Sequence, residues 1–566
     1  MSRPNETEQH MIRAAESGEV LDLSRRGNNV VRATAIRDLL RSGIVDPRGL
    51  RVVGARVTGE LNLDFISTST ALQLDDCLFE EPLSLHDTDL PALSLDGSTM
   101  PELNAENLRT RYLTMDDARC AGVVDLENAH VDGTFLFGDT SVGLMYAKGL
   151  RVARNVKAAG LHAREVRFDG CDIGGDLHLQ GAVIVNGSET ALVLNNATVG
   201  GDIHLDSSFV KATGGDCGVL MLDGSAGALH MMGAVVRTAA HCGICLDGSR
   251  FQADVRLNDG FDARSTRAPL ATIRMVDTRI GGSLLVQGSI RNDEGPAVIV
   301  QKAAIGATLN ISDTVLEATA QRPAVEIDDT DVSGNLILWP EKLVNHGDGY
   351  ELSLAGTEVG DLLVFNVPKL VQTDVFTVTV NGLTYPEPPN DTDAWLTMLR
   401  KHNFKYEAQP YQQLAAVHRA AGHEHTARRV LIAQQEDLRH RGDPGNRLWH
   451  WFLGVTLGYG YRPSRAVIGL LVTFLLALCL VWTADAHNGL TPAKDRPANS
   501  CSPVNRISLA ADLAIPLVKL GGTPRCELAN GPAGQWATGA GWVVQILGWS
   551  FATLSVAGFT GLVRKS

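Results

Sequence analysis

The chain has 566 residues, and its 50 Lys and Arg against 64 Asp and Glu give a formal net charge of −14. This acidity argues against a general nucleic-acid-binding protein, which needs a basic surface, and we expect no nucleic acid among its partners. A hydrophobic content of 44% with 20% charged residues excludes wholesale disorder. Gly occurs 57 times and aromatic residues make up only 5%, which favours stacked aliphatic layers, as in a repeat solenoid.

Residues 1–48 are predicted to form a helical cap. The segments 6–17 and 30–42 both have helical periodicity. The second segment collects its apolar residues on one face: Val30, Ala33, Ile36, Leu39 and Leu40. An unpaired solenoid end invites edge-to-edge association, so a cap is expected there. Because the first ten residues are polar and charged, we expect no signal peptide and a cytoplasmic N-terminal part.

Residues 49–384 are predicted to form the solenoid. A sequence motif recurs along this segment. It consists of an apolar residue, then Gly-Gly-Asp or a variant, then a second apolar stretch. We take the equivalent apolar positions to be Leu177, Ile203, Leu229, Val255, Leu284, Leu309, Leu336 and Leu362. Most steps are 26 residues, whereas the spacing between Leu61 and Leu177 is 20 to 22, close to the four-sided coil of pentapeptide-repeat proteins.

These patterns predict a mainly β fold. Each coil cannot bury its own aliphatic side and must stack on its neighbours, which also pairs its backbone hydrogen-bonding groups. We therefore expect a right-handed β-helix, a pentapeptide-like solenoid with an N-terminal helical cap, followed by an α-helical hairpin block and two transmembrane helices.

Two features of the solenoid are candidate sites. Cys242 and Cys245 form a CxxC pair, which is either redox-active, a metal site, or a pair of core thiols; the surrounding strand pattern favours core thiols. Matching places 26 residues apart should stack polar side chains into ladders: Asp176 with Asp202 and His178 with His204. Such ladders could bind a cation or a partner, although a solvated surface is the favoured interpretation.

A helical block is predicted after a Pro-rich linker at 385–391. It comprises a juxtamembrane helical hairpin over 391–447 and an interfacial segment over 448–465. A first helix is expected to carry Trp395, Leu396 and Leu399, and antiparallel helices are expected at 411–421 and 424–441. The segment from Arg400 to Arg465 contains eleven Lys or Arg and only five Asp or Glu. This positive charge indicates either binding to anionic lipid headgroups or an ordinary positive-inside flank of a membrane span. Three histidines straddle the hairpin turn, where a solvated turn is favoured over a metal site: His418, His423 and His425.

Two uncharged segments, 466–484 and 542–563, are predicted to cross the membrane. Their basic flanks place both termini, and the solenoid, on the cytoplasmic side of the cell membrane, so the loop 485–541 is extracytoplasmic. A disulfide between Cys501 and Cys526 is expected in this oxidising compartment. The amphipathic segment 507–517 is expected to lie on the membrane surface more readily than to re-enter it.

The second span carries a stripe of small residues: Ser550, Thr553, Ala557 and Thr560. Such a stripe suits close packing against another helix, and it could line a pore only in an assembly of several copies. Packing is the favoured interpretation, with a homo-oligomer left open.

At this point the chain resembles a known group. The segments 49–63, 411–434, 458–463 and 560–563 look like those of bacterial, mainly actinobacterial, membrane-anchored pentapeptide-like repeat proteins, over nearly the whole chain. Members often carry the label "membrane-associated oxidoreductase", so the resemblance implies such an activity without supplying a catalytic residue. The 26-residue coils depart from strict pentapeptide repeats.

Three functions are carried forward. The favoured one is a non-catalytic, membrane-tethered scaffold or sensor whose solenoid binds a protein partner, with the lipid bilayer as a second partner and no cofactor. The second is an oxidoreductase or accessory redox subunit, although the Gly-Gly-Asp phrases lack the following helix that a dinucleotide site needs. The third is an oligomeric channel, although neither span carries a charged residue.

Overall fold

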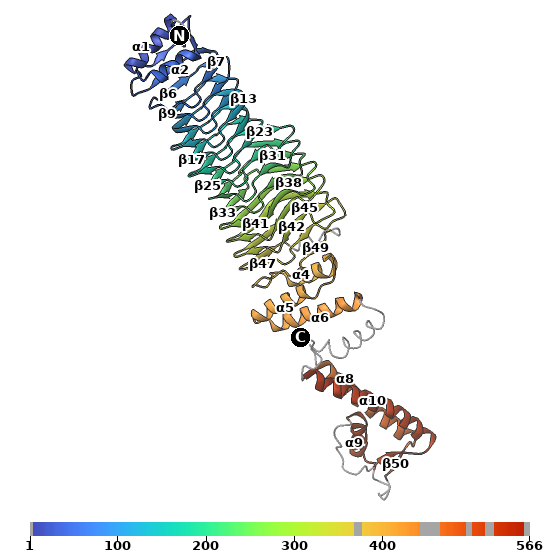
Figure 1. Cartoon of the computed structure of the whole chain (residues 1–566). Coiled ribbons are helices and arrows are strands. Elements are labelled where there is room, and N and C mark those ends of the chain that lie inside the picture. Colours follow the sequence, from blue (N-terminus) through green and yellow to red (C-terminus); the bar gives the residue numbers. More distant parts are fainter. Residues whose placement is uncertain (1–3, 367–375, 442–463, 494–500, 516–525, 560–566) are drawn as a thin grey trace. The chain divides into compact units, whose positions relative to one another are not determined.

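The structure is a computed structural model, and it describes residues 4–366, 376–441, 464–493, 501–515 and 526–559. The chain divides into two compact units, residues 1–413 and 414–566, which are described separately (Figure 1). The first unit contains a parallel β-solenoid of about 13 coils, from β1 (Leu21–Asp22) to β49 (Val378–Thr379).

Each coil has four sides, formed in most coils by four short strands; in others one strand covers two sides, as β38 (Leu284–Asn292) does. The coil that begins at residue 172 consists of β21 (Asp172–Ile173), β22 (Leu177–His178), β23 (Val183–Asn186) and β24 (Leu192–Val193). Each strand pairs in parallel with the equivalent strand of the next coil, so the backbone groups of one coil are hydrogen-bonded by its neighbours. The predicted β-solenoid is therefore present.

The interior is a set of aliphatic columns, because alternate residues of a strand point inward. One column runs in register through Leu50, Leu72, Leu93, Leu113, Phe135, Val156, Leu177, Ile203, Leu229, Val255, Leu284, Leu309, Leu336 and Leu363. The last member corrects the sequence prediction, which took Leu362. Leu362 is 39% exposed and lies at the preceding corner, where its amide donates to Asn335 Oδ1 at 3.2 Å.

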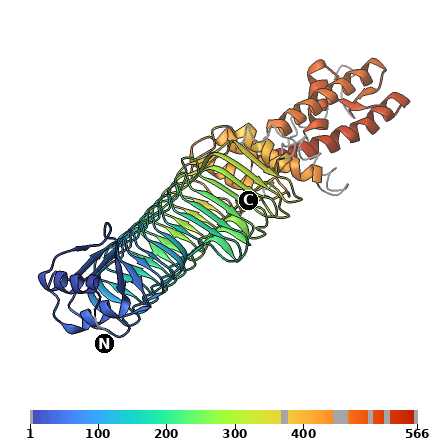
Figure 2. The same ribbon diagram turned by 90° about the horizontal axis from the view of Figure 1, so that it is seen from above.

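The lengthening of the coils from about 21 to 26 residues occurs at one corner. The inward residues Ala163 and Val166 on the third and fourth sides are three positions apart, whereas Ile184 and Leu192 in the next coil are eight apart. The coils accordingly widen along the green part of Figure 2. Buried asparagines hold several widened corners: Asn186, Asn292 and Asn345 bind corner backbone atoms through their side-chain amides.

At the start of the chain, α1 (Glu6–Ser17) and α2 (Ala33–Ser42) lie beside the first strands. The second helix was predicted to begin at residue 30, and the structure corrects this start. Val30–Arg32 instead forms β2, which pairs with β4 (Arg56–Thr58). Its two β-branched valines suit a strand, and this pairing extends the solenoid sheet. A buried carboxylate, Glu8, joins α1 to β2 by an ion pair with Arg32 at 2.6 Å.

After the solenoid, the predicted first helix is α4 (Thr392–Thr397), which continues as a π-helical turn, η1 (Met398–His402). It buries the three residues on which it was predicted: Trp395, Leu396 and Leu399. The hairpin helices are α5 (Gln409–Ala420) and α6 (Glu424–Arg441). The rest of the predicted hairpin, and nearly all of the predicted interfacial segment 448–465, lie outside the described residues.

The second unit holds two helices long and apolar enough to span a membrane, α8 (Ser464–Ala486) and α10 (Pro532–Phe559). The short helix α9 (Pro503–Ala514) packs against both, and β50 (Leu490–Pro492) pairs with β51 (Cys526–Leu528). Ala514 lies against Gly548, six residues inside the predicted second span, so α9 is not an isolated surface segment. The structure joins Cys501 to Cys526 by a disulfide with a Cα–Cα distance of 5.3 Å.

The face of α10 that packs within the chain differs from the predicted stripe. Gly541, Val544, Gly548 and Ala552 are buried, whereas Thr553 is exposed. The hydroxyls of Ser550 and Thr553 donate to carbonyl oxygens of their own helix. Glycine is favoured at the packed face because it admits close backbone approach. Ala557 is partly buried, and Thr560 lies outside the described residues.

The close stacking of coils predicts where a side chain is not tolerated. A Cβ at Gly200 would lie 2.5 Å from the carbonyl oxygen of Gly174 in the preceding coil. We expect Gly200→Val to lower the free energy of unfolding of the solenoid by about 2 kcal/mol or more, measured by urea denaturation of the full chain in detergent. Gly181→Asn is the control, because Gly181 has a φ of +68° with open space around it, and Asn adopts this conformation. Equal stability of the two variants would contradict the close stacking.

Candidate functional site

A ladder of three histidines lies on one outer side of the solenoid. His178, His204 and His230 occupy the outward positions of β22, β26 (Ile203–His204) and β30 (Leu229–His230), which pair in register. Adjacent ring centroids are 5.0 and 4.9 Å apart, with the planes inclined by only 5° and 11°. This spacing follows from the 4.7–4.9 Å separation of neighbouring strands.

Cations extend the ladder at both ends. Lys157 pairs in register before His178, and Arg256 pairs in register after His230, which gives a stripe of five outward side chains on successive coils: Lys157, His178, His204, His230 and Arg256. We call this set the basic stripe. Three of its positions were not part of the prediction, although the same 26-residue spacing places His230 and Arg256 after Leu229 and Val255.

Carboxylates flank the basic stripe. Asp176, Asp206 and Asp202 lie 3.7, 3.7 and 3.5 Å from ring nitrogens of His178, His204 and His230, respectively. Asp176 also has a structural task, because its Oδ1 accepts the amide hydrogen of Asp202 at 3.0 Å. The predicted ladder of Asp176 and Asp202 therefore lies at a corner of the coil. The Asp176 carboxylate links one coil to the next by its hydrogen bond with the Asp202 amide.

The pKa of His178 is lowered by the ladder environment. Partial burial is the main cause, and the neighbouring His204 and Lys157 also disfavour the imidazolium, while Asp176 opposes them. Neutral rings can stack without repulsion, so this shift supports the observed face-to-face arrangement.

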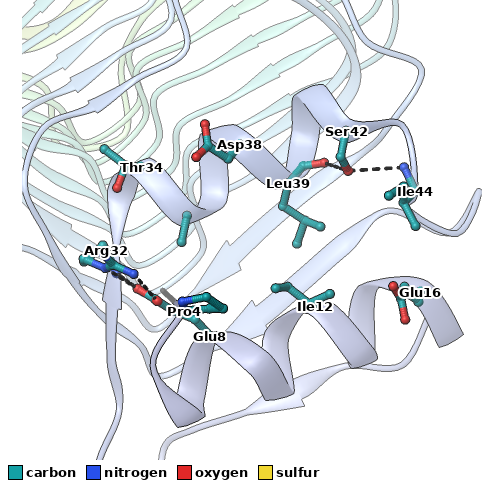
Figure 3. Close-up of a pocket in the computed structure, with 11 residues that line it drawn as sticks. Pro4, Glu8, Ile12, Glu16, Arg32, Thr34, Asp38, Leu39, Ser42 and Ile44 are labelled. Atoms are coloured by element: carbon teal, nitrogen blue, oxygen red, sulfur yellow. Dashed lines mark hydrogen bonds and ion pairs between the residues drawn. The ribbon is translucent and has the colours of Figure 1, made fainter. Parts of the chain in front are cut away.

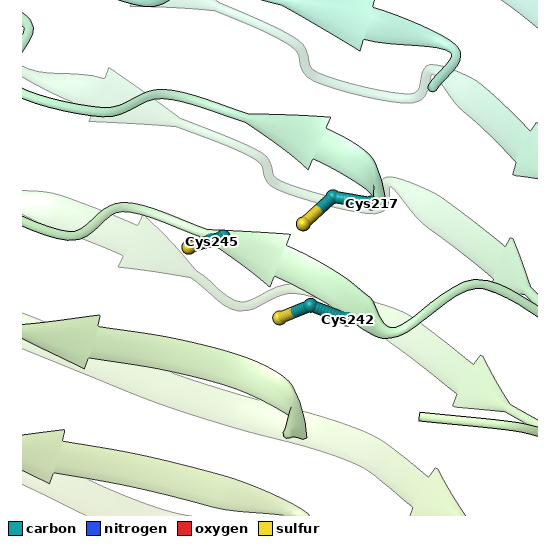
Figure 4. Close-up of side chains that lie close together, drawn as sticks. All are labelled: Cys217, Cys242 and Cys245. Carbon is teal, nitrogen blue, oxygen red and sulfur yellow. The ribbon is translucent and has the colours of Figure 1, made fainter. Parts of the chain in front are cut away.

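A second cluster joins three cysteines from two adjacent coils (Figure 4). Cys217 on β28 (Cys217–Leu220) pairs in register with Cys242 on β32 (Cys242–Cys245), and the three sulfurs lie within 4.8 Å of one another. We call Cys217, Cys242 and Cys245 the thiol cluster. The CxxC pattern singled out two of its members, and the third was missed although it precedes Cys242 by 25 residues, about one coil.

The thiol cluster is dry. Its three members are 0 to 4% exposed, and they pack with Val193, Leu220 and Leu222 outside the main aliphatic columns. Hydrogen bonds with the other two thiols, together with burial, raise the pKa of Cys217 well above its ordinary value. The thiol donors Cys217 and Cys242 instead lower the pKa of Cys245, because they stabilise a thiolate there.

A charged pair lies beside the thiol cluster. Arg274 is the in-register neighbour of Cys245 on the next coil and makes an ion pair with Asp247. Burial raises the pKa of Asp247 to about 6, and proximity to Cys245 adds to this shift. The guanidinium next to Cys245 is therefore already paired with a carboxylate.

The predicted histidine group at the hairpin turn does not converge on one point. The rings of His418 and His423 are 5.9 Å apart, and His425 is exposed. Within the part of the chain that the structure describes, the thiol cluster is the one group of three potential metal ligands close enough to share an ion.

A cavity of about 310 Å³ lies between α1 and α2 (Figure 3). Ile12, Leu39 and Ile44 supply most of its apolar wall. At one end, Glu8 accepts hydrogen bonds from the guanidinium and the amide of Arg32, and the guanidinium bond is the main cause that lowers the Glu8 pKa. Since these carboxylate oxygens already bind the protein itself, the ion pair is a structural link between α1 and β2.

Comparisons of the chain with protein-family models, with curated proteins and with solved structures found no match. The function is therefore argued from the two clusters and from the apolar helices.

The lowered pKa of His178 predicts a pH effect. The unfolded chain takes up a proton at His178 near the ordinary value of 6.5, and the folded chain does so only at lower pH. Stability is therefore fully present above pH 6.5 and decreases as the pH falls towards the folded-state pKa. We expect the thermal unfolding midpoint of His178→Gln to fall less between pH 7.5 and 5.5 than that of the wild type, and an equal fall in both would be contrary to this assignment.

Proposed function

We propose that this protein is a membrane-anchored scaffold, whose solenoid is a right-handed β-helix capped by α1 and α2 and presents the basic stripe to a protein partner. The stripe is the observation that carries the proposal. It places five cationic or imidazole side chains in one line on successive coils of an otherwise acidic protein.

The solenoid fixes the spacing of these groups better than a loop would. Each stripe residue belongs to a strand paired on both sides, so the distance between contact points is set by the backbone ladder. A partner with acidic or hydrogen-bonding side chains along an extended segment matches such a line. Hydrogen bonds to the ring nitrogens, with Lys157 and the Asp254-paired Arg256 at the two ends, then determine the register of the partner.

Membrane anchoring is proposed for the second unit. Large apolar side chains of α8 and α10 are exposed, among them Ile468, Leu471, Leu475, Trp542, Val543 and Ile546. Their exposure to water would be unfavourable by about 25 cal/mol per Å² of apolar surface, whereas hydrocarbon accepts them. Basic residues flanking the two spans favour a cytoplasmic location for the solenoid and the C-terminus, in the cell membrane.

This topology places the Cys501–Cys526 disulfide on the oxidising side. Intact cells expressing the full chain are treated with a membrane-impermeant reductant, and the newly freed thiols are labelled with an impermeant maleimide. We expect labelling at Cys501 and Cys526 only after reduction, because both sulfurs are joined in the disulfide. Cys501→Ser is the control, since it should leave Cys526 labelled without reduction. Labelling of both cysteines in wild-type cells without reduction would contradict the disulfide, and protection of both cysteines until the cells are lysed would contradict the orientation.

The scaffold proposal predicts that the protein partner contacts the side of the solenoid that carries the basic stripe and does not contact the side that carries Lys211. A photo-crosslinking amino acid placed at Arg256, at the end of the basic stripe, should yield a discrete crosslinked protein in cells. The same amino acid at Lys211, an exposed position on another side of the solenoid, should not. Replacing His178, His204 and His230 together by Ala should reduce the Arg256 product at least about tenfold, because those rings form the middle three positions of the stripe. Identical products from both positions, or none, would overturn the proposal.

A further inference from the structure

We propose that Cys217, Cys242 and Cys245 form a three-sulfur binding site for a trivalent thiophilic ion of the arsenic(III) type. The proposal is independent of the scaffold function. It rests on three observations: the sulfurs converge, their surroundings are dry, and an exposed corner of the coil lies next to two of the three cysteines.

The convergence is built into the fold. Parallel pairing brings Cys217 and Cys242 opposite each other on adjacent coils, and the strand β32 supplies Cys245 three residues later. Figure 4 shows the three sulfurs at the corners of a triangle, and no pair is more than 4.8 Å apart. Soft thiolate sulfur selects soft ions. The strands hold the ligands near their bound positions before the ion arrives, which reduces the cost of ordering them.

Burial favours a bound complex, of ion and thiolates together, that has no net charge. A net charge is costly beside Val193, Leu220 and Leu222, because these side chains offer no compensating dipoles. The nearby guanidinium of Arg274 is already paired with Asp247, so it adds little further compensation. Arsenous acid reacts with three thiols to give a neutral arsenic tris-thiolate and three water molecules, with no change in oxidation state. Three thiolates around zinc(II) would carry a charge of −1, and zinc also prefers a fourth ligand. A three-coordinate ion that forms a neutral complex with three thiolates therefore fits this cluster best.

The corner of the coil beside the cluster is exposed to solvent. Asp216 and His241 immediately precede Cys217 and Cys242, and their side chains are 80% and 66% exposed. Their closest approach is 3.9 Å, from Asp216 Oδ1 to His241 Nδ1. Two of the three sulfurs are thus one residue from solvent along the chain, although the sulfurs themselves are buried. Arsenous acid is neutral, so its entry beside this corner would bring no charge into the apolar interior.

The test uses the full chain, purified in detergent with the Cys501–Cys526 disulfide intact and the three thiols of the cluster reduced. After incubation with arsenite and desalting, native mass spectrometry should show one arsenic atom per chain with the loss of three hydrogens. A two-sulfur adduct would instead lose two hydrogens and retain a hydroxyl group. Zinc(II), offered in the same way, should be retained at least about tenfold less. Absence of a stable arsenic adduct, a two-sulfur adduct, or stoichiometric zinc in its place would overturn the proposal.

Matched variants assign the adduct to the cluster. Cys217→Ala should weaken arsenic retention at least about tenfold, because it leaves two sulfurs. Cys171→Ala removes a cysteine that is equally buried in the solenoid but outside the cluster, and it should bind as the wild type does. Wild-type retention by Cys217→Ala would contradict the assignment. If that variant does not fold, the three-hydrogen loss in the wild type, with the arsenic-bearing peptides mapped by proteolysis, still decides the question.

Discussion

The register of the parallel strands is the constraint on which the rest of the solenoid depends. Each coil hydrogen-bonds to the coils before and after it, so a residue in one coil is placed opposite a fixed residue in the next. A shift by one position would turn the aliphatic columns outward. The same pairing that buries Leu177 and Ile203 in one column therefore also stacks His178 on His204 at the surface.

Both candidate sites follow from this register. The basic stripe arises on the outward positions of one side, and the thiol cluster arises where the enlarged corner leads into another side. Neither needs a loop that brings together distant parts of the chain. The two clusters nevertheless differ in chemistry, because the stripe is partly exposed and flanked by carboxylates, whereas the sulfurs lie among aliphatic side chains.

The solenoid and the helical hairpin could be predicted from the spacing of apolar residues, which indicates the residues that share a column or a helix face. The two apolar helices could be predicted from the length of the uncharged segments. The shift from Leu362 to Leu363 could not, because an irregular last coil changes register without changing composition. Val30–Arg32 continued a helical pattern but pairs with β4, so tertiary pairing outweighed local periodicity. Cys217 was missed because the CxxC pattern considers neighbours along the chain, whereas the ladder joins residues one coil apart. The packed face of α10 was also missed, since glycines such as Gly548 carry no hydrophobic signal.

The most direct test of the central claim is a pair of engineered disulfides in the full chain. His178→Cys with His204→Cys places two thiols on adjacent coils in register, and His178→Cys with His230→Cys places the same residue types two coils apart. Disulfide formation requires Cα atoms about 4.4–6.8 Å apart. The register predicts that mild oxidation links residues 178 and 204, identified by peptide mass spectrometry, and leaves residues 178 and 230 unlinked within one chain. Equal linking of both pairs, or linking of the 178–230 pair alone, would contradict it.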